Sequence, residues 1–332
     1  MTVCRICENE EGNRPFIVRE MQFGFRDEFA YFECSRCGCL QIEDVPADMS
    51  RYYPNNYYSY RVSGPTVDYK RSGLQRYKIS AIVRVLTRHY YDRKTRVGEW
   101  IARRSSVSGD YPLWIRRQKL NLGLSADASI LDVGCGNGKF LLDLREQGFS
   151  DLTGIDPFIQ DDIVHGPGVK ILKRALNGFS GQFDFIMLHH SFEHMPDPLP
   201  ALRSIHELLK PNRYLLLRIP VAGCYGWRQY QTNWVSLDAP RHFFLHTRES
   251  IRILASQSGF ELAEQLFDSD GLCHWGSELY RRDIPLMDER SPWHNPAQET
   301  FTKEELRGFV DLDAKLNDTG EADCSAFYLY KR

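Results

Sequence analysis

Three glycines separated by single residues occur in the stretch ILDVGCGNGKFLLDL, residues 130–144. An apolar run precedes them and an amphipathic run follows, so the spacing predicts a turn between a strand and a helix. Such a turn lets polar groups of a ligand meet backbone N–H groups near the positive end of the helix. The order Gly134, Gly136, Gly138 differs from the dinucleotide fingerprint, and GNGKF lacks the hydroxyl residue of a phosphate-binding Walker loop. The turn therefore predicts a cofactor site and disfavours triphosphate chemistry.

Cysteine pairs near the N-terminus have the spacing of a metal site. CRIC at 4–7 and CSRC at 34–37 each separate two thiolates by two residues, so that one tight turn supplies two corners of a tetrahedron. We expect a structural zinc ion on Cys4, Cys7, Cys34 and Cys37, with a redox pair as the alternative. The odd total of nine cysteines also fits a reducing compartment better than a disulfide framework. Because MTVCRICENE lacks the regions of a secretory signal, the expected location is the cytoplasm.

Histidines and carboxylates follow two apolar runs that are typical of neighbouring strands. HHSFEHMPDP begins at residue 189, and LDAPRHFFLHT begins at residue 237. Since the carboxyl ends of parallel strands meet at one edge of a sheet, both clusters should converge there. A histidine at that edge could remove a proton from a substrate. His242 and His194 are the candidate bases, and Glu193 or Asp238 could orient the imidazole; the alternative is that these residues only anchor loops.

The motifs ILDVGCGNGKFL, GIDP and FDFIMLHHSFEHMPDP resemble successive cofactor motifs of class I S-adenosylmethionine-dependent methyltransferases, over about residues 126–265. The resemblance implies in-line displacement of a methyl group from the sulfonium of that cofactor. The protein then mainly aligns the reacting atoms and, where needed, removes a proton. By the same resemblance, the cofactor contacts are Gly134 and Gly136 at the methionine moiety, Asp132 at its amino group, Asp156 on the ribose, Leu176 near adenine and His189 beside the sulfonium.

A zinc module ahead of this fold resembles a group of bacterial methyltransferases for deoxysugars and surface polysaccharides. LDAPRHFFLHT and HWGSELYRRDIPL strengthen that resemblance. It implies a small-molecule acceptor, a nucleotide-linked sugar or related glycan intermediate, with C- or O-methylation left open because the histidine loop departs from the pattern of known sugar C-methyltransferases. It also favours His242 as the base. We expect one wall of the acceptor cleft to be formed by the tyrosines at positions 52, 53, 57, 58 and 60; the alternative is that these side chains pack between the modules.

Two other functions compete with this interpretation. A nucleic-acid methyltransferase would use the zinc module and a basic helix to hold RNA, but HHSFEH replaces the Asn/Asp-Pro-Pro-aromatic run typical of base amino-group methylation, and no DNA partner is expected. A non-catalytic cofactor-binding protein would be expected to have lost the glycines.

The basic segment 70–104 carries eleven Lys and Arg against two acids, which fits contact with anionic surfaces or a solvated helix face. The oligomeric state stays open.

Alternating apolar runs and helical patterns predict the fold that must position these residues. We expect strands at 129–134, 152–157, 169–175, 183–190 and 213–220, which is the order of an α/β protein. The resemblance adds a Rossmann-like seven-stranded sheet, mostly parallel, whose last strand, CSAFYLYKR, is antiparallel. The expected organisation is a zinc-binding module at 1–45, an aromatic and basic helical segment at 46–125, and the methyltransferase domain at 126–332. No apolar run approaches the ~18 residues that span a bilayer.

Overall fold

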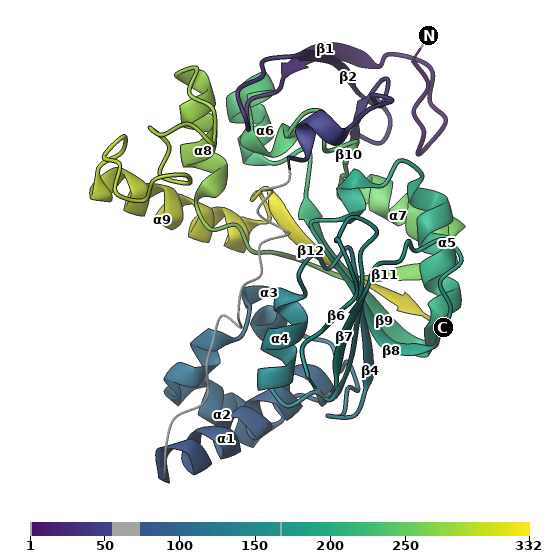
Figure 1. The fold of residues 1–332 in the computed structure, drawn as a ribbon, viewed down its shortest axis with the longest axis vertical. Coiled ribbons are helices and arrows are strands. Elements are labelled where there is room, and N and C mark those ends of the chain that lie inside the picture. The colour runs from purple at the N-terminus through teal and green to yellow at the C-terminus, as the bar shows by residue number, and fades with distance from the viewer. Residues whose placement is uncertain (1, 55–73, 167) are drawn as a thin grey trace.

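A mostly parallel sheet forms the centre of the computed structural model, which describes residues 2–54, 74–166 and 168–332 (Figure 1). Its eight strands lie in the order β11-β12-β9-β8-β4-β5-β7-β6. Their bounds are β4 Ser129–Val133, β5 Asp151–Ile155, β6 Ile163–Val164, β7 Val169–Leu172, β8 Phe183–His189, β9 Leu209–Pro220, β11 Phe260–Phe267 and β12 Cys324–Lys331. β12 pairs antiparallel with both β9 and β11, so the C-terminal strand is inserted as expected. The expected α/β sheet is confirmed, and the two-residue β6 adds an eighth strand.

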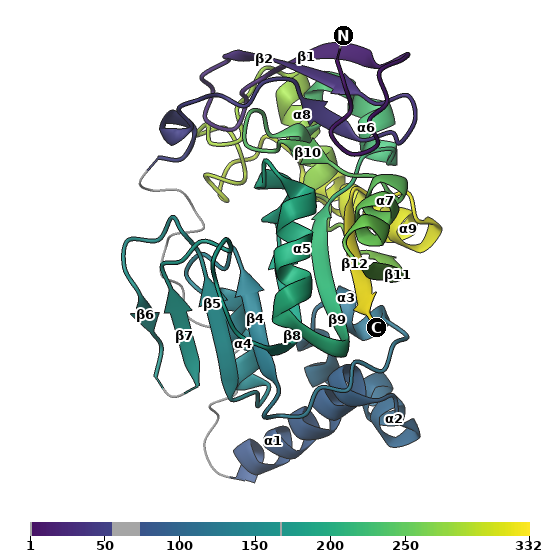
Figure 2. The ribbon, with the colours of Figure 1, turned by 90° about the vertical axis from the view of Figure 1, so that its right-hand side faces the viewer.

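Two layers of helices cover the sheet because its strands are apolar on both faces. Buried side chains of α4 (Lys139–Glu146), α3 (Leu113–Arg117) and α1 (Leu74–Thr87) belong to the cluster on one face. Those of α5 (Pro198–Leu208) and α7 (Arg248–Gln257) belong to the cluster on the other face. Figure 2 shows α5 in front of the sheet, with α1 and α2 (Arg96–Arg104) below the strands. The remaining short helices are η1 Ser50–Tyr52, η3 Arg88–Asp92, η4 Ser106–Asp110, η5 Phe192–His194, α6 Tyr225–Tyr230, η6 Gln231–Asn233 and η7 Val235–Leu237.

The run LPALRSIHELLK, residues 199–210, has a helical pattern, and the following Pro211 and Asn212 are typical of a helix end, but the helix ends earlier. α5 already ends at Leu208, and β9 begins at Leu209 and continues through both residues. Asn212 has a φ of 59°, a left-handed conformation that asparagine tolerates. The pairing of β9 with β8 shifts register between Phe183 and Phe185. The Pro-Asn pair therefore marks an irregularity inside a strand.

The N-terminal residues form a second, four-stranded sheet with the order β1-β2-β3-β10. β1 (Arg14–Arg19), β2 (Glu28–Glu33) and β3 (Leu40–Ile42) come from this segment, whereas β10 (Phe244–Leu245) comes from the loop that carries His242. The cysteines Cys4, Cys34 and Cys37 share one buried cluster with strand residues of the central sheet. Figures 1 and 2 show the β1–β2 hairpin above one end of that sheet. The histidine loop and the N-terminal module thus form one packed unit.

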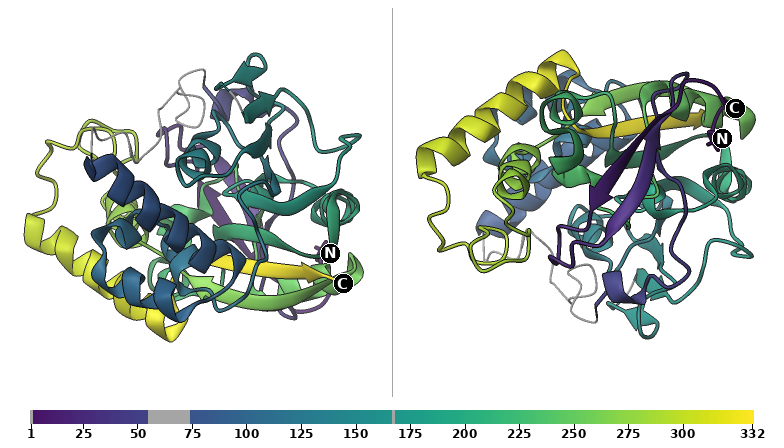
Figure 3. Two further views of the ribbon diagram at one scale, coloured as in Figure 1. Left: turned by 90° about the horizontal axis from the view of Figure 1, so that it is seen from below. Right: turned by 90° about the horizontal axis from the view of Figure 1, so that it is seen from above.

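The last block adds α8 (Leu272–Arg281) and α9 (Lys303–Thr319), which extend to one side of the molecule when it is seen from above (Figure 3). His274 of α8 and Asp313 of α9 are both buried, and His274 Nε2 lies 3.0 Å from Asp313 Oδ1. This pair fastens the two helices to each other.

The apolar side of the basic segment packs on the main domain where the structure describes it. Leu86 is buried with Tyr90, Tyr91 and Phe149 in one cluster, as a solvated helix with one packed stripe requires. The side chains of 74–78 and residues 57, 58, 60, 70 and 71 lie outside the described residues. Contact of this segment with anionic surfaces stays a prediction. In the described part of the chain, no helix combines the length and hydropathy needed to span a membrane.

Candidate cofactor and active site

A cavity of about 490 Å³ opens at the carboxyl ends of the parallel strands, a volume typical of ligand pockets. Gly134 follows β4, Asp156 follows β5, and Leu176 follows β7. The loop after β8 and the first turns of α5 close the opposite side. Further lining residues are Tyr53, Phe158, Arg174, His190, Ser191, His194, Met195 and Asp197. Three of the six expected cofactor contacts therefore line the cavity, namely Gly134, Asp156 and Leu176, while Asp132, Gly136 and His189 are not among its lining residues.

The glycine turn is held by the carboxylate of Asp156. The N–H of Gly136 donates to Asp156 Oδ2 at 2.9 Å, and the N–H of Phe158 donates to Asp156 Oδ1 at 2.8 Å. Gly134 has a φ of 75°, and a Cβ added to it would lie 2.5 Å from Ser191 Cβ. Glycine is therefore required here by the approach of Ser191 as well as by the backbone conformation. The two strand ends are tied together at the floor of the cavity.

Asp132 is buried beneath this turn and keeps an unused hydrogen-bonding atom. Among the described residues no partner reaches its Oδ1. Burial raises the pKa of the Asp132 carboxyl to about 8, and the negative charge of Asp156 adds to the rise. A buried acceptor without a donor is costly, so this oxygen suits a positively charged or N–H-bearing ligand group.

Replacing Asp132 with asparagine should change how stability depends on pH. Unfolded Asp132 titrates near its ordinary pKa of about 3.9, so the wild type loses about 1.4 kcal/mol of folding free energy per pH unit between about 4 and 8 from this group. The Asp132→Asn variant has no carboxyl group at this position, so its folding free energy does not fall with pH in this way. We expect its stability advantage over the wild type to grow from pH 5.5 to 8 and then level off. Urea unfolding at several pH values measures this, with Asp151→Asn at the exposed start of β5 as the control; a difference independent of pH contradicts the assignment.

His189 faces away from the cavity, which corrects its expected place beside the sulfonium. Its ring stacks on Phe140 with centroids 4.1 Å apart and contacts Trp114 on the other face of the sheet. Burial lowers the pKa of His189 well below its usual value. Side chains alternate between the two faces of a sheet along a strand, so His189 points to the same face as Met187. Met187 belongs to the buried cluster that includes side chains of α4. His190, the next residue, lines the cavity instead.

Glu193, His194 and His242 form a polar group at the cavity's edge, in which Glu193 and His242 are buried and His194 is partly exposed. The two imidazole rings meet edge to face with centroids 4.7 Å apart. His194 lines the cavity, and the hydroxyl of Tyr53 lies 3.2 Å from its Nδ1. Burial lowers the pKa of His194 to about 4, so the ring is neutral at pH 7. Although burial alone raises the pKa of Glu193, the contacts with His190 and the neighbouring histidines lower it to about 2. The expected convergence of the two histidine clusters is thus present in the structure.

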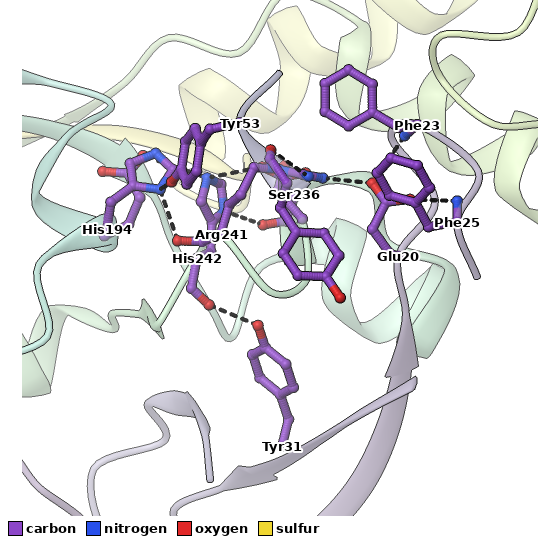
Figure 4. A network of polar contacts seen from close by, with 12 residues as sticks. Glu20, Phe23, Phe25, Tyr31, Tyr53, His194, Ser236, Arg241 and His242 are labelled. Atoms are coloured by element: carbon purple, nitrogen blue, oxygen red, sulfur yellow. Dashed lines mark hydrogen bonds and ion pairs between the residues drawn. The ribbon is translucent and has the colours of Figure 1, made fainter. Parts of the chain in front are cut away.

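A fully buried arginine supports the loop that carries His242. Arg241 Nη2 lies 3.0 Å from Glu20 Oε1 and 2.6 Å from Asp238 Oδ1 (Figure 4). Its Nη1 donates to the carbonyl of Tyr52 at 3.2 Å. Glu20 in turn accepts from the backbone N–H groups of Phe23 and Phe25, both at 2.9 Å. One charged network therefore fixes the N-terminal module, the Tyr52 segment and the histidine loop relative to one another.

Phe158 and Glu20 are among the residues of this region that sequence reasoning missed. Phe158 lines the cavity, is 75% exposed and lies parallel to the Tyr53 ring at 6.4 Å. Its place two residues after Asp156 was a usable signal, because residues at that strand end face the ligand crevice. Glu20 gave no signal, since its pairing with Arg241 joins residues far apart in the sequence.

The four expected zinc ligands lie together in the N-terminal module. Cys4 Sγ is 3.6 Å from Cys37 Sγ, Cys7 Sγ is 3.5 Å from Cys34 Sγ, and all four sulfurs lie within 4.8 Å of one another. Zn–S bonds of about 2.3 Å in a tetrahedron separate sulfurs by roughly 3.8 Å. The amide of Gln41 donates to Cys4 Sγ at 2.9 Å, as thiolate ligands require of their surroundings. The arrangement fits a tetrahedral metal ion.

Part of the chain is similar in sequence to known methyltransferases. Residues 103–265 match the family model of a methyltransferase domain. EEF1A lysine methyltransferase 2 of Mus musculus is 51% identical over 158 residues, which cover 46% of this chain and 59% of that protein. The ubiquinone biosynthesis O-methyltransferase of Bordetella avium is 34% identical over 97 residues, covering 26% and 40% respectively. The chain therefore spans about 40–59% of the length of these two relatives.

Among solved structures, the comparison finds the cyclopropane synthase MmaA2 from Mycobacterium tuberculosis, at 16% identity and a TM-score of 0.43 over 81% of this chain and 90% of that one. From the strand order with its inserted antiparallel strand, and from the family match, residues 103–265 belong to a class I S-adenosylmethionine-dependent methyltransferase domain. The described resemblance of the sequence motifs to this class is confirmed.

Proposed function

We propose that this protein transfers a methyl group from S-adenosylmethionine to a small-molecule acceptor, a nucleotide-linked sugar or related glycan intermediate. The observation that carries the proposal is one cavity lined by two chemically different sets of residues. Gly134, Asp156 and Leu176 form the set expected to hold the cofactor, called here the cofactor end. Tyr53 and His194 belong to the other set, whose polar groups can meet an acceptor.

The cofactor end fits the proposed ligand. Asp156 can accept from ribose hydroxyls, the backbone at Gly134 leaves room for the methionine moiety, and Leu176 offers an apolar surface for adenine. Asp132 Oδ1, buried below the turn without a partner among the described residues, supplies a hydrogen-bond acceptor for the amino group. The bound cofactor supplies a methyl group on a sulfonium, which is its own leaving group. The chain's contribution is to hold donor and acceptor in line and keep water out, which can contribute on the order of 7–11 kcal/mol.

On the acceptor side we assign a joint role to His194, His242 and Glu193. They take up the proton, or offset the positive charge, of the acceptor's nucleophilic atom. His194 lines the cavity, while His242 reaches it through contact with that ring. A sugar-type acceptor is supported by the resemblance of LDAPRHFFLHT and by a cavity lining with one cation, Arg174, beside Asp156 and Asp197. Such a lining does not favour a polyanion such as RNA.

In the N-terminal module we propose a structural zinc ion on Cys4, Cys7, Cys34 and Cys37.

Incubation with methyl-labelled cofactor and a panel of nucleotide sugars tests the proposal. Label on a nucleotide sugar supports it. Label only on RNA, or only on a protein such as EEF1A, retains methyl transfer but overturns the sugar acceptor. Binding of cofactor without turnover on any acceptor favours a non-catalytic protein.

His242→Ala should lower kcat by about 10²–10⁴-fold while leaving cofactor affinity unchanged, because proton-handling groups contribute that much and His242 does not line the cofactor end. Steady-state turnover and cofactor titration of the same preparation separate the two effects. His294→Ala, which removes an exposed histidine, is the matched control. Equal turnover of His242→Ala and wild type would show that this assignment is wrong.

A further inference from the structure

We propose that Glu193, His194 and His242 bind a divalent transition-metal ion beside the cofactor cavity, separately from the cysteine site. Their nearest ligand atoms lie within 4.8 Å of one another. Two imidazoles and one carboxylate form a donor set typical of Zn²⁺ and other first-row divalent ions.

Both imidazole rings are oriented for metal binding. His194 Nδ1 lies 2.8 Å from the carbonyl oxygen of Arg241, and His242 Nδ1 lies 2.7 Å from that of Ser236. A carbonyl only accepts, so each Nδ1 carries the proton and each Nε2 presents its lone pair. Metal-binding histidines are usually held in this way, with the other ring nitrogen donating to a carbonyl or carboxylate.

The lone pair of His242 points toward negative charge. Its Nε2 lies 3.9 Å from Glu193 Oε1 and 3.8 Å from Asp238 Oδ2. These separations are too long for hydrogen bonds. Neighbouring ligand atoms around an ion at about 2.0–2.2 Å are roughly 3.0–3.6 Å apart, so a small contraction would close the set on a cation. A cation between these atoms turns a repulsive contact into an attractive one.

Glu193 lacks the hydrogen bonds that a buried carboxylate needs. Its side chain is fully buried, and neither oxygen has a hydrogen-bond partner among the described residues. The nearest ring nitrogen is His190 Nδ1, 3.3 Å from Oε1. An ionised carboxylate in such surroundings is costly unless it is paired or coordinates a metal.

The charges of the surrounding network do not balance without a cation. Three carboxylates, the fully buried ones of Glu20 and Glu193 and that of Asp238, whose side chain is 11% exposed, face a single arginine, Arg241, among the ion pairs of the described residues. Arg218 lies near His190 but is paired with Asp268 at 2.7 Å. The three ionised carboxylates and the one guanidinium leave two excess negative charges, which a divalent ion would compensate.

The ion would lie next to His194, which lines the cavity, and would offer an open coordination position to an acceptor oxygen. This role rests on the proposed function, whereas binding of the metal does not. As a Lewis acid the ion would lower the pKa of a coordinated acceptor hydroxyl, whose proton then passes to solvent water. With the ion bound, His194 and His242 act as its ligands and not as bases.

Metal content of the full-length protein as purified, together with Co²⁺ taken up from excess, tests the proposal. We expect the wild type to hold about one ion per chain more than Glu193→Gln and His242→Ala, with His294→Ala as the control that matches the wild type. Circular dichroism establishes that the variants are folded. Equal occupancy in wild type and both folded variants overturns the proposal.

X-ray absorption of Co²⁺ in the unaltered protein supplies a second test that no folding defect can affect. We expect nitrogen and oxygen neighbours around Co²⁺ bound outside the cysteine site, and only sulfur neighbours would overturn the proposal. Both measurements omit cofactor and acceptor. Loss of the metal site and failure of methyl transfer are therefore distinguishable results.

Discussion

Arg241→Met should destabilise the protein by about 3–5 kcal/mol, because it leaves the buried carboxylate of Glu20 and the largely buried carboxylate of Asp238 without their cation. Methionine occupies much of the arginine's volume but carries no charge. The loss should also loosen the link between the N-terminal module and the histidine loop. Urea unfolding followed by tryptophan fluorescence measures the change in the free energy of unfolding.

The matched control is Arg252→Met. Arg252 also pairs with a carboxylate, Glu249, at 2.6 Å, but both side chains are largely exposed. Surface ion pairs contribute at most about 1 kcal/mol. Equal effects of the two substitutions would mean that the Arg241 network does not hold the site together.

Cys34→Ser should unfold the N-terminal module, since zinc ligation supplies much of the folding energy of small metal-binding modules. Because β10 completes the sheet of this module, the loop with His242 should lose order as well. We expect faster hydrogen exchange over residues 2–45 and 236–246, and turnover reduced at least tenfold. A strong chelator should reproduce these effects.

Cys39→Ser provides the control within the same module. Cys39 is equally buried but lies outside the four-cysteine group. It should keep zinc, the exchange pattern and turnover. Retention of all three by Cys34→Ser would contradict a structural metal ion at this place.

The sheet could be predicted from the sequence because its strands are short apolar runs joined by helical patterns. The turn at Gly134, the end of β5 at Asp156 and the inserted C-terminal strand follow from local sequence and from the family resemblance. Alternation along FDFIMLHH would also have placed His189 and His190 on opposite faces, so that only one of them can face the cavity.

Other features depend on contacts between distant residues and left no local pattern. β10 is two residues long and exists because it pairs with β3, about two hundred residues earlier. The Glu20–Arg241 ion pair is of the same kind. Local signals at Pro211 and Asn212 predicted a helix end, but pairing of β9 with its neighbours overrode them.

Calorimetric titration with S-adenosylhomocysteine tests the central claim most directly, which is that the cavity between Gly134, Asp156 and Leu176 binds this class of cofactor. We predict saturable binding by the wild type and by Asp151→Ala, whose exposed carboxylate lies at the opposite end of β5. Asp156→Ala should bind more weakly by about 1–3 kcal/mol, or roughly 5- to 150-fold, because ribose hydroxyls lose their acceptor. No binding by the wild type, or equal affinity of Asp156→Ala, would contradict the account.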